Sequence, residues 1–368
     1  MKPFSDVPLP LNRLAINDAL IHAVDAGASD IHFLSNAPII AGVHGKMLPL
    51  IQRRIQSHEL RGLLDEMLGE YALPTIAKAQ AVNTSYQLRR NRDETLRFRV
   101  NAMGCMIDGV DGIQMTFRYI PSEPPSIESL QVEPEIVAHS QVQQGLIAVT
   151  GSTGSGKSTL LAAMIRQRLE NPHSHEKIQT FESPIEFVYY GIERHNNVIT
   201  QCEIPRHLPS FTQGVSEALR SAPTTILVGE ARDKETISEC CVFAQTGHLV
   251  LTTVHTNSVA ETLQRMVSIF PANERSFQTA GLIDSFQLIV TQRLVPDTHG
   301  QRVAIREYLP FNPQVRQRLF NADASHFSAI VRSLVEEFGR PMIAHANERL
   351  RDGLIDRYTY DLIGKSYG

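Results

Sequence analysis

The residues that decide the fold are Gly151-Ser152-Thr153-Gly154-Ser155-Gly156-Lys157-Ser158, which match the pattern G-x-x-x-x-G-K-[ST]. An apolar run at 146–150 precedes them and a helix-like stretch at 159–168 follows, the context that a phosphate-binding loop requires. Glycines let successive N–H groups turn toward phosphate oxygens, Lys157 can reach the β- and γ-phosphates, and the Ser158 hydroxyl can ligate Mg²⁺. We therefore expect ATP and Mg²⁺ here, with ATP held by Ser152, Thr153, Gly154, Ser155, Gly156, Lys157, Ser158 and Thr159.

Apolar runs alternate with helical stretches from residue 145 onward. The runs at 146–150, 178–181, 226–228 and 249–254 are typical of buried strands. Buried strands separated by helices predict a parallel sheet with right-handed crossovers. The expected fold class is therefore α/β, with the phosphate loop after one strand of that sheet.

A stiff connection divides the chain. Three prolines, Pro121, Pro124 and Pro125, forbid a helix at 120–126 and favour an extended linker. Before it, helix-like and alternating stretches, with a hairpin around the polar residues 89–94, predict an α+β domain at 1–119. After it we expect an ATP-binding domain at 127–310 and amphipathic helices at 311–368.

Two glutamates follow predicted strands. Glu230 ends the run at 226–228 like the acid of a Walker B motif, so we expect it to orient or deprotonate the attacking water. Glu182 follows the run at 178–181, so we expect it at the carboxyl ends of the strands, in the crevice where open α/β sheets bind ligands. There it can help to hold Mg²⁺ through water. The structural alternatives are a helix cap or surface charge for Glu230 and a Ser-Pro turn for residues 182–186.

Two histidines bracket the run at 249–254. His255 follows the carboxyl end and faces the crevice, where a neutral imidazole can sense the γ-phosphate or transmit its loss. His248 precedes the run, so we expect a structural role for it. A hydrogen-bonded structural histidine is also the alternative for His255.

Three arginines outside the nucleotide domain suggest arginine fingers. Arg97 and Arg99 alternate along a predicted strand and so share one of its sides, and Arg118 ends the next alternating run. Such guanidinium groups can stabilise charge on the γ-phosphate. The alternative is a solvated strand face, which we favour for the arginines at 89–92.

Composition excludes several classes of protein. The net charge of −4 provides no global basic field for nucleic acid or anionic lipid. No run of 18 or more apolar residues occurs and residues 1–8 resemble no secretion signal, so we expect no transmembrane segment. We therefore expect a cytoplasmic chain or one peripheral to a membrane. The four cysteines include no C-x-x-C pair, which argues against a disulfide framework and against a zinc ribbon.

Several short sequence motifs, in their order and spacing along the chain, resemble those of the PilT/GspE family of secretion and pilus ATPases. They are the phosphate loop, the Glu182 box, Val228-Gly229-Glu230-Ala231-Arg232-Asp233, the box ending at His255, Arg97-Phe98-Arg99-Val100-Asn101 and Thr291-Gln292-Arg293-Leu294. The resemblance covers roughly residues 25 to 310. It implies a PAS-like N-terminal domain, a RecA-like ATPase domain and a homo-hexameric ring, with Glu230 as the Walker B acid.

Departures from the family pattern point to one branch. No tetracysteine zinc insertion is present, which disfavours the type II secretion and pilus-extension members. Ser183 stands where the family commonly has an aspartate, so Glu182 should carry more of the metal coordination. The short chain, the Glu-Ser-Pro-Ile-Glu box and the divergent C-terminal helices are most similar to the DotB/TraJ branch.

The expected function is an ATPase that powers a type IVB secretion or conjugation apparatus through ATP-driven domain motion. Its partners would be inner-membrane components of that apparatus at the cytoplasmic face. A pilus-retraction motor is the alternative within the family. A RecA-like nucleic-acid translocase is less favoured because the net charge argues against strong nucleic-acid binding. A nucleotide-gated adaptor that scarcely hydrolyses ATP is a third alternative.

Overall fold

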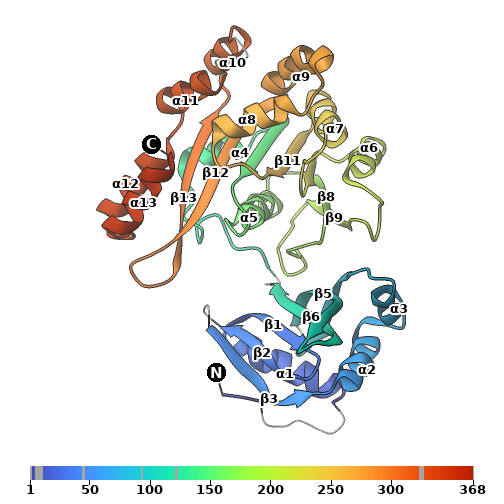
Figure 1. Cartoon of the computed structure of the whole chain (residues 1–368). Coiled ribbons are helices and arrows are strands. Elements are labelled where there is room, and N and C mark those ends of the chain that lie inside the picture. Colours follow the sequence, from blue (N-terminus) through green and yellow to red (C-terminus); the bar gives the residue numbers. More distant parts are fainter. Residues whose placement is uncertain are drawn as a thin grey trace. The chain divides into compact units, whose positions relative to one another are not determined.

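The computed structural model describes residues 2–4, 11–43, 46–92, 94–120, 123–322 and 327–367. The chain forms two compact units, residues 1–122 and 123–368 (Figure 1). The division lies within the stretch 120–126 that the prolines mark. Residues 121 and 122 of that predicted linker are outside the described residues.

The N-terminal unit is an antiparallel sheet with helices (Figure 1). Its strand order is β3-β2-β1-β6-β5-β4, and the first turn of α1 is capped by the Asn12 side chain, which accepts from the Ala15 amide at 2.9 Å. The elements are α1 (Arg13–Asp25), β1 (Ala28–Leu34), β2 (Ala37–Val43), β3 (Lys46–Ile55), α2 (Ser57–Leu68), α3 (Ala72–Ala77), β4 (Val82–Arg89), β5 (Thr95–Ile107) and β6 (Val110–Ile120).

One hydrophobic core holds this unit together. Alternate residues of β5, including Phe98 and Val100, are fully buried in it, and Phe117 of β6 lies against the Phe98 ring. Strands β4 and β5 form the predicted hairpin, with Arg89 paired to Thr95. The N-terminal unit is therefore an α+β unit, as the sequence predicts.

The second unit is built on a seven-stranded sheet of order β13-β12-β7-β11-β10-β8-β9. All neighbouring strands are parallel except β12 and β13, which pair antiparallel. The predicted parallel α/β sheet is confirmed, and the antiparallel edge is an addition that the apolar runs did not reveal. The strands are β7 (Gly145–Thr150), β8 (Lys177–Glu182), β9 (Val198–Glu203), β10 (Thr225–Val228), β11 (Leu249–Val254), β12 (Phe286–Pro296) and β13 (Arg302–Pro310).

Helices cover both faces of this sheet (Figure 1). Alternate residues of β7 enter two separate cores: Leu146 and Ala148 pack with α6 to α11, whereas Ile147 and Val149 pack with α4 and α5. Burial on both faces explains why these strands read as continuous apolar runs. The helices are α4 (Pro134–Ser140), α5 (Lys157–Leu169), α6 (Phe211–Ser221), α7 (Lys234–Gln245), α8 (Val259–Ser268), α9 (Ala272–Ser285), α10 (Pro313–Phe320), α11 (Phe327–Phe338), α12 (Met342–Arg351) and α13 (Arg357–Tyr367).

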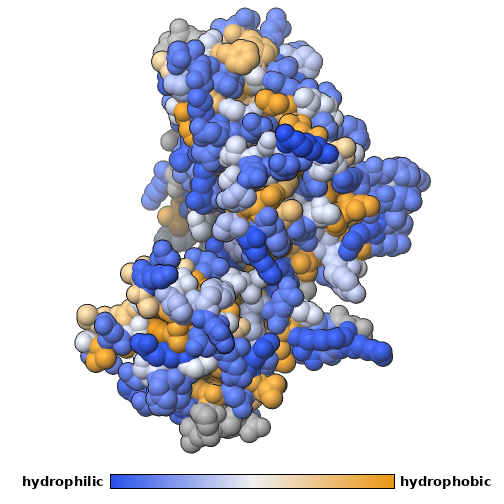
Figure 2. All heavy atoms as spheres, turned by 90° about the vertical axis from the view of Figure 1, so that its right-hand side faces the viewer, coloured by the Kyte–Doolittle hydropathy of each residue, from blue (hydrophilic) through white to orange (hydrophobic). Residues whose placement is uncertain are grey.

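The last two helices, α12 and α13, have a small core of their own. Met342 and Ile363 pack there against Val295 and Ile305 of the β12–β13 pair. Within the described residues, every helix is too short or too polar to cross a membrane. Figure 2 shows one face of the molecule, on which apolar side chains are interspersed among hydrophilic ones.

Candidate nucleotide-binding site

The phosphate loop lies between β7 and α5, as the sequence predicts. Gly151 and Gly156 have φ angles of 144° and 82°, in the region that disfavours side chains. A Cβ at Gly151 would lie 2.3 Å from the carbonyl oxygen of Gln292, and one at Gly156 would lie 2.7 Å from Gln292 Nε2. Glycine is therefore required at both positions by backbone angle and by the close approach of β12.

Lys157 is the first residue of α5, and its side chain turns back into the loop. Its Nζ donates to the carbonyl oxygens of Gly151 and Ser152, at 2.9 Å each. Burial lowers the pKa of Lys157, and the carboxylates of Glu230 and Glu186 oppose that shift. The ammonium thus lies inside the loop, near two acidic side chains.

The carboxyl ends of four parallel strands bring the predicted residues to one edge of the sheet. Val228 pairs with both Phe181 and Thr252, and Val254 pairs with Thr150. The residues that follow these strand ends are therefore neighbours: the phosphate loop, Glu182, Glu230 and His255. Open α/β sheets bind ligands at this edge.

Glu230 lies beside a histidine and an arginine. His255 Nε2 is 3.2 Å from Glu230 Oε1, and Arg232 forms an ion pair with the same carboxylate. Burial and the charges of Lys157 and Arg232 lower the pKa of His255, while Glu230 opposes the shift. A neutral His255 with a carboxylate partner fits a group that responds to charge at the site.

Glu182 is buried deeper than Glu230. Its carboxylate accepts hydrogen bonds from Thr180 Oγ1 at 2.6 Å, Gln201 Nε2 at 3.3 Å and the Glu186 amide at 3.3 Å. Burial raises the pKa of Glu182, and these hydrogen bonds oppose the shift. The structure thus fixes the orientation of this carboxylate at the end of β8.

His248 lies at the amino end of β11, away from the strand ends that carry the site. Its Nδ1 is 3.1 Å from Thr246 Oγ1, and its ring lies 4.4 Å from that of Phe243. These contacts agree with the structural role expected for it.

The three arginines of the N-terminal unit differ in their surroundings. Arg97 is buried, Arg118 pairs with Asp30 at 2.7 Å, and Arg99 is exposed. Arg99 lies directly opposite Arg118 across β5 and β6, so the two share one face of the sheet. The position of Arg99 on the same face as Arg118 agrees with the alternation of side chains along a strand. The burial of Arg97 could not be predicted from that alternation.

The loop residues fit a nucleotide phosphate and a magnesium ion. Ser155 Oγ is buried and has no hydrogen-bond partner among the described residues, so a polar ligand can satisfy it. Ser158, in the first turn of α5, is partly exposed and offers a hydroxyl. Across the described ranges, no three His, Cys, Asp or Glu side chains form a metal cage. Mg²⁺ needs none, because it usually keeps waters and phosphate oxygens as ligands.

Two residues of the site were missed as functional candidates. Gln292 Nε2 donates to the Ser155 carbonyl at 2.7 Å, and Arg306 Nε donates to Gln292 Oε1 at 2.7 Å. The sequence contributed Gln292 only as part of a family pattern. No local signal marks it, because its role depends on β12 lying beside β7.

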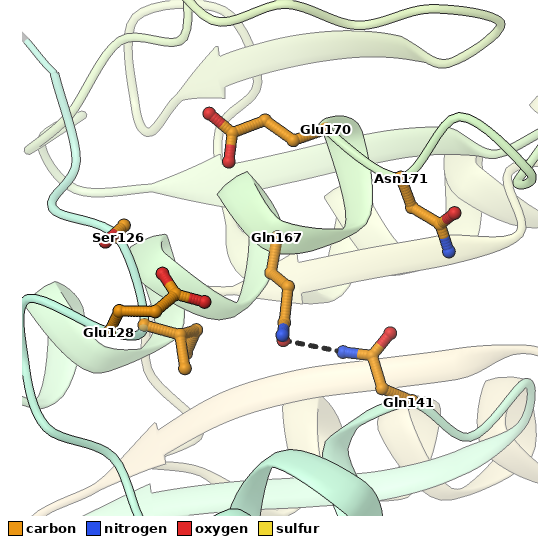
Figure 3. Close-up of a pocket in the computed structure, with 7 residues that line it drawn as sticks. Ser126, Glu128, Gln141, Gln167, Glu170 and Asn171 are labelled. Carbon is orange, nitrogen blue, oxygen red and sulfur yellow. Dashed lines mark hydrogen bonds between the residues drawn. The ribbon is translucent and has the colours of Figure 1, made fainter.

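A pocket of about 370 Å³ lies elsewhere in the same unit (Figure 3). It is lined by residues 126–128, Gln141 and the end of α5 with its following residues, and it contains the hydrogen bond from Gln141 to Gln167 at 2.8 Å. The phosphate loop lies at the amino end of α5 and the pocket lies at its carboxyl end. A helix of 13 residues spans about 20 Å at 1.5 Å per residue. This pocket is therefore separate from the phosphate site.

The loop, the strand-end acid and the parallel sheet define a P-loop nucleotide-binding protein. Among these proteins, the chain belongs to the PilT/GspE family: the family model "Type II/IV secretion system protein" matches residues 8–342. The type IV pilus retraction ATPase PilT of Pseudomonas aeruginosa is 35% identical over 317 residues, which are 86% of this chain and 88% of that protein.

Solved structures agree with this assignment. The X-ray structure of the Legionella pneumophila ATPase DotB is 40% identical, with a TM-score of 0.90 over 100% of this chain and 99% of that one. The pilus retraction motor PilT with bound ADP is 30% identical, with a TM-score of 0.83 over 95% and 96%. The chain is a DotB-like member of a family of secretion and pilus ATPases.

Proposed function

We propose that this protein is a Mg²⁺-dependent ATP hydrolase that powers a type IVB secretion or conjugation apparatus. The observation that carries the proposal is the meeting of Lys157, Glu230 and His255 at one edge of the sheet. The similarity to DotB supports the secretion branch, since it extends over the whole chain. The hydrolysis of ATP would then drive motion between the two units.

Each residue of the site has a role in this proposal. The loop amides and Lys157 bind the phosphates, and Glu230 accepts a proton from the attacking water. His255 contacts Glu230 and responds to the charge of the γ-phosphate. Ser158 and, through water, Glu182 would hold Mg²⁺, which when bound neutralises charge on the β- and γ-phosphates.

We extend the proposal to the N-terminal unit and to assembly. The second unit would be a RecA-like ATPase domain at 127–310, followed by C-terminal helices at 311–368, and the chain would form a homo-hexamer. The N-terminal unit would be PAS-like, because an antiparallel sheet with helices agrees with that class. Arg97, Arg99 and Arg118 would serve the γ-phosphate as arginine fingers; Arg99 and Arg118 are exposed, and Arg118 is paired with Asp30.

The partners in this proposal are proteins of a membrane apparatus. The ATPase would be cytoplasmic and would dock on inner-membrane components at their cytoplasmic face. A pilus-retraction motor is the alternative that similarity to PilT supports. Co-purification with secretion or pilus components separates these two. Salt-dependent binding of single-stranded DNA with stimulated hydrolysis would instead favour a nucleic-acid translocase.

The Lys157→Ala variant tests the site. We expect it to lower both ATP affinity and turnover, with turnover reduced at least about 10²-fold, because a charge that stabilises the phosphates is removed. Release of phosphate and binding of a fluorescent ATP analogue measure the two effects. Lys365→Ala, at an exposed lysine of α13, is the matched control. Near-native turnover of Lys157→Ala, or a monomeric mass with and without ATP, would contradict the proposal.

The Arg99→Ala variant tests the link between the units. Guanidinium groups bind phosphate oxygens by charge-assisted hydrogen bonds, and hydrolysis removes their target. We expect ADP affinity within about threefold of native and a loss of preference for ATP of about 1–3 kcal/mol. Arg92→Ala, in the exposed hairpin loop, serves as control. Equal weakening for ADP and ATP would assign Arg99 a structural role.

A further inference from the structure

Gln292 connects strand β12 to the phosphate loop. The residue is 4% exposed, and its Nε2 donates to the Ser155 carbonyl oxygen at 2.7 Å. The strand also passes so close to the loop that a Cβ at Gly151 would lie 2.3 Å from the Gln292 carbonyl oxygen. The loop is thus held against β12 by one buried side-chain hydrogen bond.

This hydrogen bond fixes the direction of a loop amide. In a planar trans peptide the C=O and the N–H point in opposite directions. Because the Ser155 carbonyl faces Gln292, the N–H of Gly156 points away from β12. A phosphate cannot occupy the side filled by β12, so this amide points to the side open to a phosphate.

Arg306 sets which end of the Gln292 amide faces the loop. Its Nε donates to Gln292 Oε1 at 2.7 Å, and a guanidinium has no acceptor atom. The oxygen of Gln292 must therefore face Arg306 and its NH₂ must face Ser155. An amide in the opposite orientation would place two donors together at Arg306.

Arg306 is itself fixed by several partners. Its side chain is 2% exposed and donates to the carbonyl oxygens of Leu130 and Gln131, at 3.1 and 3.2 Å. It also pairs with Glu133 at 3.1 Å. A buried arginine with all these contacts has little freedom to turn, so it holds the Gln292 amide in one orientation.

We propose that Gln292, oriented by Arg306, is a positioning residue for the nucleotide phosphates. It acts through the Ser155–Gly156 peptide and does not touch the phosphates. The proposal rests on the proposed function of the loop as a nucleotide site. It assigns to β12, the neighbour of β7, a part in shaping that site.

The Gln292→Glu variant is the decisive test. The new carboxylate can still accept from Arg306 but cannot donate to Ser155, so it places an acceptor against a carbonyl oxygen. We expect ADP affinity to fall about tenfold, the usual scale for a lost hydrogen bond to a buried group. We expect the nucleotide-free variant to stay folded at the temperature of the titration, since the contact with Arg306 remains, but to unfold at a lower temperature than native because an acceptor faces the Ser155 carbonyl.

Gln287→Glu is the matched control, because it makes the same change at a half-buried position near the amino end of β12. It should leave ADP affinity near native. Calorimetric titration with ADP measures all three proteins. Equal ADP affinity in Gln292→Glu and native protein would overturn the inference, as would an equal loss of ADP affinity in Gln287→Glu.

Failure of the nucleotide site itself gives a different result. If the native protein does not bind ADP, the proposed function fails before any variant is compared. If Gln292→Glu does not fold, Gln292→Met replaces it, since methionine has a similar length and makes neither hydrogen bond. Weaker ADP binding by folded Gln292→Met supports the inference, and native binding overturns it.

Discussion

Glu230 and Glu133 have the same kinds of partner in very different surroundings. Glu230 contacts Arg232 and His255, at the carboxyl edge of the sheet. Glu133, just before α4, contacts Arg306 at 3.1 Å and His345 at 3.0 Å. The arginine side chain is 72% exposed in the first group and 2% exposed in the second.

Burial decides what each group can do. Water screens the pair of Glu230 with exposed Arg232, so the pair contributes little stability and its partners can be exchanged. Glu133 is nearly inaccessible, and its charge depends on Arg306, His345 and Arg340. Removing one partner there would leave a buried charge uncompensated. The second group therefore contributes to folding stability, whereas the first is open to a role in the proposed chemistry.

The protonation of the histidines follows the same difference. The Arg306 backbone amide donates to His345 Nδ1 at 2.9 Å, and His345 Nε2 lies 3.0 Å from both Glu133 Oε1 and Arg349 Nε. Burial lowers the pKa of His345 to about 3, although the Glu133 charge opposes the shift. The pKa of half-exposed His255 is also lowered, by burial and by Lys157. His255 lies at the edge of the sheet that carries the phosphate loop, where a ligand can change its surroundings.

The largest expected effect is on folding, from Glu133→Ala. It leaves the buried Arg306 without a carboxylate and removes one of the two carboxylates that pair with Arg340, so we expect the free energy of unfolding to fall by about 3–5 kcal/mol. Urea denaturation measures this loss. Glu135→Gln, at an exposed glutamate of α4, should change stability very little. Native stability in Glu133→Ala would break the distinction between the two groups.

The next effect is on turnover, from Glu230→Gln. The amide keeps the shape of the side chain but removes the base, so we expect ATP binding to persist and hydrolysis to slow at least about 10²-fold. Single-turnover kinetics measures the chemical step, and Glu235→Gln, in the first turn of α7, is the control. Loss of ATP binding with an unchanged rate at saturation would remove Glu230 from its role. A large loss of folding stability would also contradict the comparison.

The smallest expected effect is on the pH dependence of stability. Because the folded-state pKa of His345 lies near 3, the unfolded chain takes up a proton below about pH 6.5 that the folded chain does not. Stability is therefore lost as the pH falls, by about 2 kcal/mol between pH 7 and pH 5 from this group. His345→Gln should remove that part of the slope in urea denaturation.

A matched change checks this effect. His299→Gln, at an exposed histidine between β12 and β13, should keep the native slope. The lowered pKa of Glu133 adds an acid-dependent loss at lower pH, so the comparison is made above pH 5. A native slope in His345→Gln would show that the buried histidine is not held neutral.

Local sequence patterns were sufficient for much of the site. The loop at 151–158 needs glycines at positions of positive φ and a lysine beside them, and these requirements act within eight residues. Strands buried on both faces must be apolar along their length, so their ends were visible in the sequence. Glu230 and His255 could therefore be placed at one edge of the sheet before any contact was known.

Tertiary structure decided the rest, because burial and partners come from segments distant in the chain. Arg97 and Arg99 look alike in the sequence, yet one is buried and the other exposed. Glu133, Gln292 and Arg306 carry no local pattern of function, and they meet only because β12 lies beside β7 and pairs with β13. When a charged or amide side chain is buried, protein groups replace water as its hydrogen-bond partners, and these groups determine its role. For these residues, those groups are set by packing across the whole ATPase unit.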